Sequence, residues 1–116
     1  MAEKLRNHLR GCLAQKQQQK EWKAKADILM DTEKYNMAIT YYNNILSKAI
    51  NNDLPERFYG DVYNNLGVAY ARLFEYEQAA AAFRSAYRLN ANSAESLESI
   101  IMCDLITDND KRLKID

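Results

Sequence analysis

Two residues near the N-terminus have the types and the spacing of a metal half-site. His8 and Cys12 are four positions apart, so a helix would place both on one face. Imidazole and thiolate both bind zinc, but a zinc site needs four ligands, and only one further cysteine, Cys103, follows much later in the chain. We interpret the pair as a half-exposed histidine beside a core-facing cysteine, and we predict no metal and no other cofactor.

The sequence shows none of the usual arrangements of catalytic residues. A nucleophile activated by histidine would have to use His8, the single histidine, and nothing around it suggests a pocket. The glycines Gly11, Gly60 and Gly67 are isolated, so there is no phosphate-binding loop. The two cysteines match no redox spacing. We therefore predict a protein that is not an enzyme.

Composition favours one all-helical domain. The chain has 116 residues, of which 47% are hydrophobic, with only 3 Gly and 1 Pro. An all-β chain of this length would need many more turn residues. No apolar stretch approaches 18 residues and no signal-peptide core is present, so we expect a cytoplasmic protein with reduced thiols.

Charge is balanced overall but uneven along the chain. The formal net charge is zero, which predicts neither a nucleic-acid nor a membrane partner. Residues 1–25 hold seven basic and two acidic side chains, a net charge of +5. We interpret this segment as a solvated helix face rather than an arm that grips nucleic acid.

A repeat with an offset of 41 positions organises the middle of the chain. When residues 22–46 are set above residues 63–87, large residues meet large ones and small residues meet small ones. The matched pairs are Trp22 and Tyr63, Ala26 and Gly67, Leu29 and Tyr70, Ala38 and Ala79, Tyr42 and Phe83, and Ile45 and Ala86. Each copy has two runs of helical spacing, which predicts two helical hairpins.

The second copy resembles the tetratricopeptide repeat. It reads Tyr63-x-x-Leu66-Gly67-x-x-Tyr70 and then Ala79-x-x-x-Phe83-x-x-Ala86, against the repeat pattern W-x-x-L-G-x-x-Y followed by A-x-x-x-F. The first copy fits less closely, because Lys25 stands where Leu is usual. The resemblance covers about residues 19–106 and implies an all-α, right-handed superhelix of helical hairpins.

Small and large residues of the signature have separate roles in the core. Small side chains let the two helices of a hairpin cross closely, and aromatic side chains fill the space beside the crossing. The predicted core signature comprises Trp22, Ala26, Leu29, Ala38, Tyr42, Tyr63, Leu66, Gly67, Tyr70, Ala79, Phe83 and Ala86.

The repeat also predicts the order of segments. We expect an N-terminal helical extension over residues 1–18, repeat one over 19–52, an insertion over 53–59, repeat two over 60–93, a capping helix over 94–106 and a polar tail over 107–116. The usual repeat has 34 residues, so the offset of 41 adds about two helical turns. Asp53 and Pro55 form a helix-start signal, so the third helix should begin early, near Pro55. The last helix is either a cap or part of a longer array, and its rich apolar face favours a cap.

The resemblance implies that the first helix of each hairpin lines a concave groove for a protein or peptide. The groove candidates are Lys23, Asp27, Asn64, Asn65, Val68, Arg72, Glu95, Glu98 and Met102. One subfamily grips a C-terminal carboxylate there, and Lys23 and Asn65 stand at matching positions. Asp27, Glu95 and Ser99 replace the Asn, Lys and Arg that this clamp requires, so we predict no carboxylate clamp. A peptide with a basic residue that reaches Glu95 and Glu98 fits better.

We therefore predict a protein–protein interaction module. Two alternatives stay open: a sensory or regulatory fragment of a larger bacterial regulator, and a self-assembly module. The second would form a homodimer through the N-terminal helix, where Leu5, Leu9, Cys12 and Leu13 make one apolar stripe.

Overall fold

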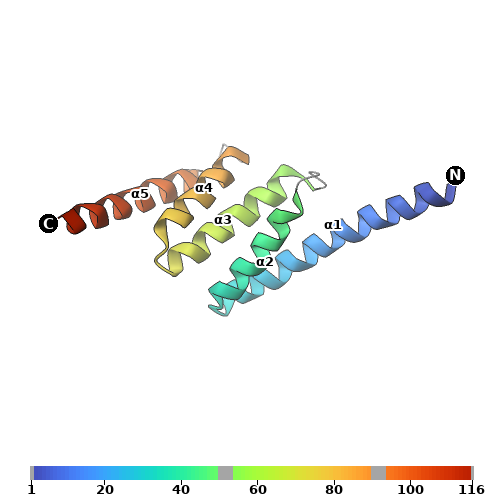
Figure 1. The fold of residues 1–116 in the computed structure, drawn as a ribbon, viewed down its shortest axis with the longest axis horizontal. Coiled ribbons are helices and arrows are strands. Elements are labelled where there is room, and N and C mark those ends of the chain that lie inside the picture. The colour runs from blue at the N-terminus through green and yellow to red at the C-terminus, as the bar shows by residue number, and fades with distance from the viewer. Residues whose placement is uncertain (1, 50–53, 90–93, 116) are drawn as a thin grey trace.

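Five α-helices make up the part of the chain that the structure describes. A computed structural model describes residues 2–49, 54–89 and 94–115, and no strand occurs among them. The helices are α1 (Ala2–Asp31), α2 (Tyr35–Ser47), α3 (Glu56–Arg72), α4 (Tyr76–Leu89) and α5 (Ala94–Ile115), as Figure 1 shows. The predicted all-α fold class is confirmed.

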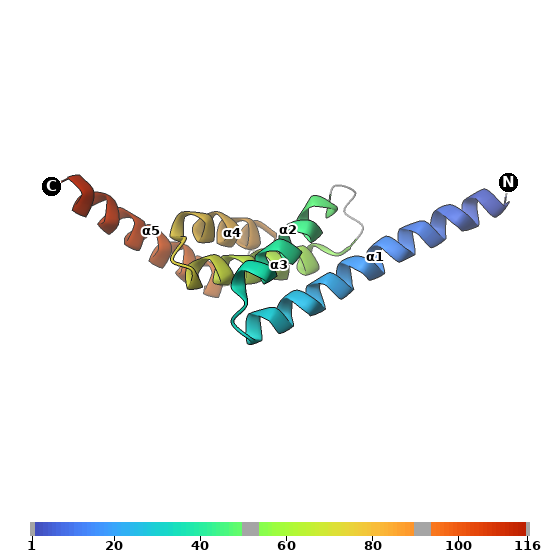
Figure 2. The same ribbon diagram turned by 60° about the horizontal axis from the view of Figure 1, so that its bottom comes forward.

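The molecule is elongated, with principal extents of 69 × 29 × 23 Å. Helices α2, α3 and α4 pack side by side in its middle, while the first half of α1 and the last half of α5 project at opposite ends (Figures 1 and 2). The segment expected as an N-terminal extension is continuous with the first helix of repeat one, because α1 runs unbroken from Ala2 to Asp31.

Each hairpin turns through the same backbone motif. Glu33, two residues after the end of α1, has a φ of 62°, and Phe74, two residues after the end of α3 and 41 positions later, has the same φ. The next residue donates its N–H five positions back, from Lys34 to Leu29 at 2.8 Å and from Glu75 to Tyr70 at 2.9 Å. This is the Schellman arrangement, which satisfies carbonyl groups at a helix end. The offset of 41 is thus a repeat of backbone geometry as well as of side chains.

The helices of each hairpin cross closely at the small residues. Ala26 and Ala38 are fully buried in repeat one. In repeat two a Cβ added to Gly67 would lie 2.7 Å from Cε1 of Phe83, so any larger residue would have to displace that ring. Ala79 and Ala86, on the second helix of this repeat, are also buried.

Four signature residues lie at the edge of the core instead of inside it. Trp22, Leu29 and Tyr70 are half-buried and pack against the buried cluster, and Tyr63 is half-buried as well. For the three aromatic residues the reason is that large rings with a polar end are seldom fully enclosed in a small domain, because that end reaches toward water.

The inserted residues pack onto the first helix. Helix α3 begins at Glu56, close to its expected start, and its first turns bury Tyr59 and Gly60. The Tyr59 hydroxyl donates a hydrogen bond of 2.8 Å to Oε1 of Gln19, the one buried polar residue in the described part of the chain. Asp53, the expected cap, lies outside the described residues. The extra turns therefore tie α3 to α1.

Helix α5 is longer than the sequence suggested. The expected capping helix ended at residue 106, whereas α5 continues to Ile115. Residues 107–115 contain neither Gly nor Pro, so no strong stop signal interrupts the helix. None of the helices in the described segments is both long and apolar enough to span a bilayer.

Candidate functional site

One carboxylate joins the first three helices on the side where the groove was expected. Asp27 on α1 accepts three hydrogen bonds: one of 2.9 Å from Lys23 Nζ, one of 2.5 Å from the Tyr42 hydroxyl on α2, and one of 3.1 Å from Asn65 Nδ2 on α3. We call Lys23, Asp27, Tyr42 and Asn65 the polar cluster. Three of these were predicted as groove residues, and the fourth was predicted as core.

Burial keeps one member of this cluster, the Tyr42 hydroxyl, in its protonated form. Tyr42 is fully buried, and desolvation, followed by its hydrogen bond to Asp27 and the negative charge there, raises the pKa of its hydroxyl well above the ordinary range. The hydroxyl therefore keeps its proton and acts as a donor. Lys23 and Asp27 remain partly exposed, with side-chain exposures of 21% and 38%. The polar cluster is therefore anchored in the core by Tyr42 and exposed to solvent at Lys23 and Asp27.

The polar cluster has a direct bearing on carboxylate binding. Lys23 and Asn65 are the two residues that stand at carboxylate-clamp positions, and both are bonded to Asp27. To bind Lys23 and Asn65, a ligand carboxylate would have to displace the carboxylate of Asp27. The negative charge of Asp27 would also repel it.

A second region lies on the other side of α3, where an apolar hollow of about 370 Å³ opens between α3, α4 and α5. It is lined by Val68, Ala71 and Arg72 of α3, Phe83 of α4, and Glu98, Ser99, Met102 and Cys103 of α5. We call this the apolar hollow. It brings together four of the predicted groove residues, with Arg72 and Glu98 supplying one charge of each sign.

Cys103 closes the inner wall of the apolar hollow as an unreactive thiol. Its residue is buried, and burial, together with the negative charge of Asp104, raises the pKa of the thiol. A protonated thiol is a weak nucleophile and a poor metal ligand. Cys103 thus contributes apolar surface to the wall.

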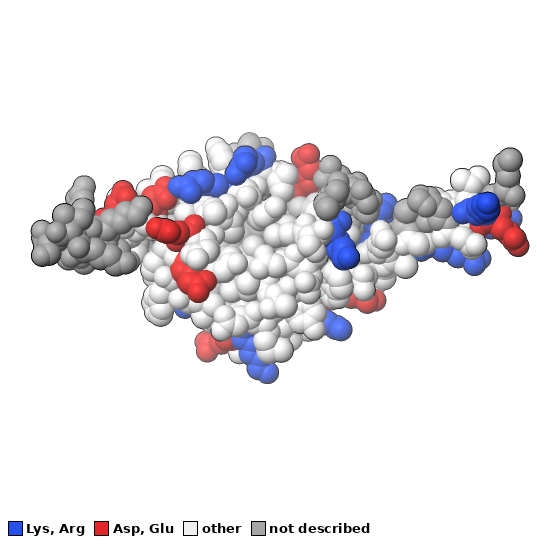
Figure 3. Space-filling view, in the orientation of Figure 1, with Lys and Arg blue, Asp and Glu red and all other residues white. Residues whose placement is uncertain are grey.

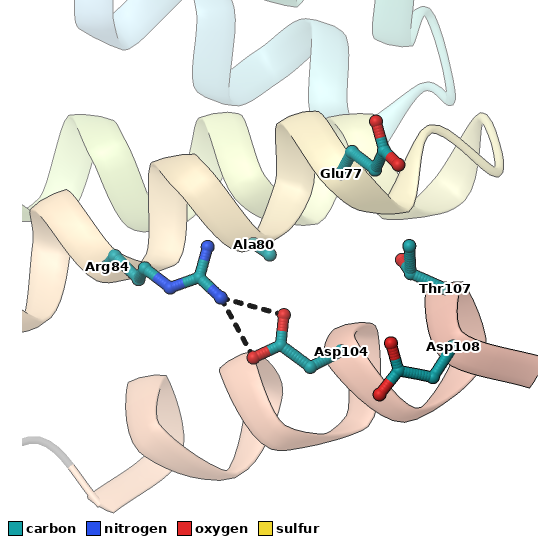
Figure 4. A pocket seen from close by; sticks show the side chains of 6 residues that line it. All are labelled: Glu77, Ala80, Arg84, Asp104, Thr107 and Asp108. Carbon is teal, nitrogen blue, oxygen red and sulfur yellow. Dashed lines mark hydrogen bonds and ion pairs between the residues drawn. The ribbon is translucent and has the colours of Figure 1, made fainter. Parts of the chain in front are cut away.

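A third region, which sequence reasoning missed, lies between α4 and α5. This hollow of about 530 Å³ is lined by Glu77, Ala80, Arg84, Asp104, Thr107 and Asp108 (Figure 4). Arg84 donates to both carboxylate oxygens of Asp104 at 2.8 Å. No local sequence motif predicts the pairing of Arg84 with Asp104, because the two residues are 20 positions apart on different helices.

The remaining predicted residues are placed as follows. Asn64 is half-buried on α3 and takes part in an interaction of its own. The side chains of Glu95, His8 and Cys12 lie outside the described residues. Among the side chains that are described, no group of three or more His, Cys, Asp or Glu could hold a metal ion.

Paired antiparallel helices with matched turns, stacked along α1, α3 and α5, define a helical-hairpin repeat protein. The sequence profile described as "Tetratricopeptide repeat" matches residues 19–92, most of the chain. The chain therefore belongs to the tetratricopeptide repeat family, whose members are non-catalytic repeats that generally mediate protein–protein interaction. No curated protein shows significant sequence similarity to it.

Proposed function

We propose that this chain binds a short segment of another protein in the groove beside α3, with the apolar hollow as the anchor site. The observation that carries the proposal is that Val68, Arg72, Glu98 and Met102 line one hollow. Apolar hollows with a few convergent polar groups are the usual form of a recognition pocket.

The chemistry of the hollow selects the ligand. Val68, Phe83 and Met102 offer apolar surface, and methionine adapts its shape to different side chains. Glu98 adds a negative charge at the α5 wall, and Arg72 adds a positive charge at the α3 wall. The best ligand is a peptide with an apolar anchor residue and a basic residue that reaches Glu98.

The polar cluster argues against a free C-terminal carboxylate as the anchor. Lys23 and Asn65 already donate hydrogen bonds to Asp27, so these two side chains are not available to bind a ligand carboxylate. Amidation of a peptide's C-terminus should therefore leave its affinity unchanged.

A library of random peptides displayed on phage tests the proposal, with selected sequences then measured as synthetic peptides by calorimetry. Met102→Asp should abolish binding because it puts a charge at the apolar anchor. Met37→Asp is the matched control: Met37 is a methionine of similar exposure, 53% against 57%, but lies on α2. Binding that survives Met102→Asp unchanged would contradict the proposal.

The two alternative functions, a regulatory fragment and a self-assembly module, have unequal support. None of the interactions in the described residues favours a regulatory fragment over a binding module. Self-association through the N-terminal helix has one specific observation behind it: Leu5, Leu9 and Leu13 are all exposed on the projecting half of α1. It is a second candidate function, and the three α1 leucines that support it lie outside the apolar hollow.

A further inference from the structure

Two exposed apolar stripes lie far apart in the molecule, one on α1 and one on α5. On the projecting half of α1, Leu5, Leu9 and Leu13 are 65%, 59% and 65% exposed. On α5, a stripe of the same kind is formed by Leu97, Ile101 and Leu105, which are 44%, 52% and 54% exposed. Residues spaced by four lie along one face of a helix, so each set is continuous.

The two stripes also have the same pattern of neighbouring charges, with the sign reversed. Arg6 follows the first leucine of the α1 stripe and Lys16 stands three positions after the last one. Glu98 and Asp108 occupy the corresponding places beside the α5 stripe. One amphipathic helix surface is thus basic, and the other is acidic.

The surrounding charges extend this difference. Residues 2–18 contain four basic side chains and one acidic one, a net charge of +3. Helix α5 as a whole contains five acidic and three basic side chains, a net charge of −2, and the three basic ones all lie after residue 110, beyond the stripe. Figure 3 shows mostly basic side chains along the projecting end of α1 and a group of acidic side chains over the α4–α5 end. Asp104 is already paired with Arg84, so the charges available to a partner are chiefly those of Glu98 and Asp108.

We propose that the basic stripe of α1 in one copy of this chain docks on the acidic stripe of α5 in a second copy. Within one molecule the α1 stripe lies on the projecting half of α1 and the α5 stripe on the half of α5 beside α4, with α2 and α3 between them, so they cannot meet (Figures 1 and 2). Pairing α1 with α1, or α5 with α5, would juxtapose like charges, which disfavours both symmetric dimers. The head-to-tail pairing joins opposite charges and covers both apolar stripes.

A head-to-tail contact has a consequence for assembly. Because it uses two different surfaces, each copy retains one unused surface after the first contact, and growth continues into a chain or closes into a ring. Three apolar residues on each side make a small interface, so the association is weak and responds to salt.

Sedimentation equilibrium under reducing conditions, from about 10 µM to about 1 mM protein, tests the proposal at a range suited to weak affinity. The average mass should rise past that of a dimer with concentration and fall when salt is added. A monomer at every concentration would overturn the proposal. A mass that stops at the dimer and is unaffected by α5 variants would also overturn it, because it would indicate α1–α1 pairing.

Charge reversal gives the sharper test. The variant Arg6→Glu/Lys16→Glu and the variant Glu98→Lys/Asp108→Lys should each self-associate at least about tenfold more weakly than the parent chain. Mixed in equal amounts, they should assemble again, because every contact then joins opposite charges. Failure of the mixture to assemble would overturn the proposal.

An apolar pair of variants checks the stripe itself and does not depend on the charge changes. Leu9→Asn should weaken assembly at least about tenfold, while Ile28→Asn, at an equally exposed position on the other half of α1, should leave assembly unchanged. Circular dichroism of all variants confirms that they remain helical. Equal effects of Leu9→Asn and Ile28→Asn would contradict the assignment of the stripe.

Discussion

The two repeats share one hairpin geometry but differ at a matched pair of positions. Repeat one has Asp27 and Tyr42, and repeat two has Val68 and Phe83 exactly one repeat offset later. In the first pair the hydroxyl is hydrogen-bonded to the carboxylate. In the second pair both side chains line the apolar hollow. At this matched position the first repeat is therefore closed by internal hydrogen bonds, and the second offers open apolar surface.

This difference separates the residues that build the fold from those that set the polarity at the matched position. The small residues Ala26 and Gly67 and the large rings of Tyr42 and Phe83 pack the two hairpins in the same way. The Tyr42 hydroxyl and the Asp27 carboxylate place a hydrogen-bonded polar pair where repeat two has an apolar pair.

The largest effect is expected at the ring of repeat two. Phe83→Ala should lower the free energy of unfolding by about 3–5 kcal/mol, because the buried ring fills the space against Gly67. Urea denaturation measures the change. Phe74→Ala is the control, since Phe74 is 79% exposed, and it should cost less than about 1 kcal/mol. Equal costs would show that Phe83 is not a core residue.

The polar pair of repeat one can be converted into the apolar pair of repeat two. Asp27→Val alone should cost about 1–3 kcal/mol, because it leaves the buried Tyr42 hydroxyl without its acceptor. Adding Tyr42→Phe should recover part of that loss, since the unpaired hydroxyl is then gone. A double-mutant cycle measured by urea denaturation gives the coupling. Strict additivity of the two single changes would show that the bond contributes nothing.

Alkaline pH should weaken repeat one selectively. The raised pKa of Tyr42 means that the folded chain holds this proton more tightly than the unfolded chain does. Its contribution to stability is therefore fully present below the ordinary tyrosine pKa of about 10 and is lost as pH rises above that value. Melting temperatures between about pH 8 and about pH 11 should fall more steeply for the parent than for Tyr42→Phe. Parallel curves would contradict this.

The smallest effect is expected at the matched turns. Glu33 and Phe74 both adopt a left-handed φ of 62°, which costs free energy for any residue with a Cβ. Glu33→Gly and Phe74→Gly should each stabilise the chain by about 0.5–1 kcal/mol. Lys25→Gly, at an exposed position inside α1, should instead destabilise it by about 1 kcal/mol. Thermal denaturation of the three variants gives the comparison.

Much of the hairpin architecture follows from local pattern. The spacing of small and aromatic residues predicts four helices and their close crossings, because helical periodicity is a property of neighbouring residues. The end of α5 was wrong because a polar segment without Gly or Pro carries no signal that distinguishes a helical end from a tail. The edge positions of Trp22 and Tyr63 also escaped prediction, since periodicity gives a side chain's direction but not how far its neighbours enclose it.

The sequence by itself determined that this chain is a helical-hairpin repeat, because the matched small and aromatic residues recur at helical spacing. Only the tertiary structure decided that Asp27 bonds to Tyr42 and Asn65, which lie 15 and 38 positions away. It likewise decided that Val68 and Met102 share one hollow, and that the stripes of α1 and α5 stay uncovered. The physical reason is that a repeat pattern fixes how each helix faces its neighbour in the chain. Which polar groups satisfy one another, and which apolar faces remain exposed, depend on where helices distant in sequence come to rest.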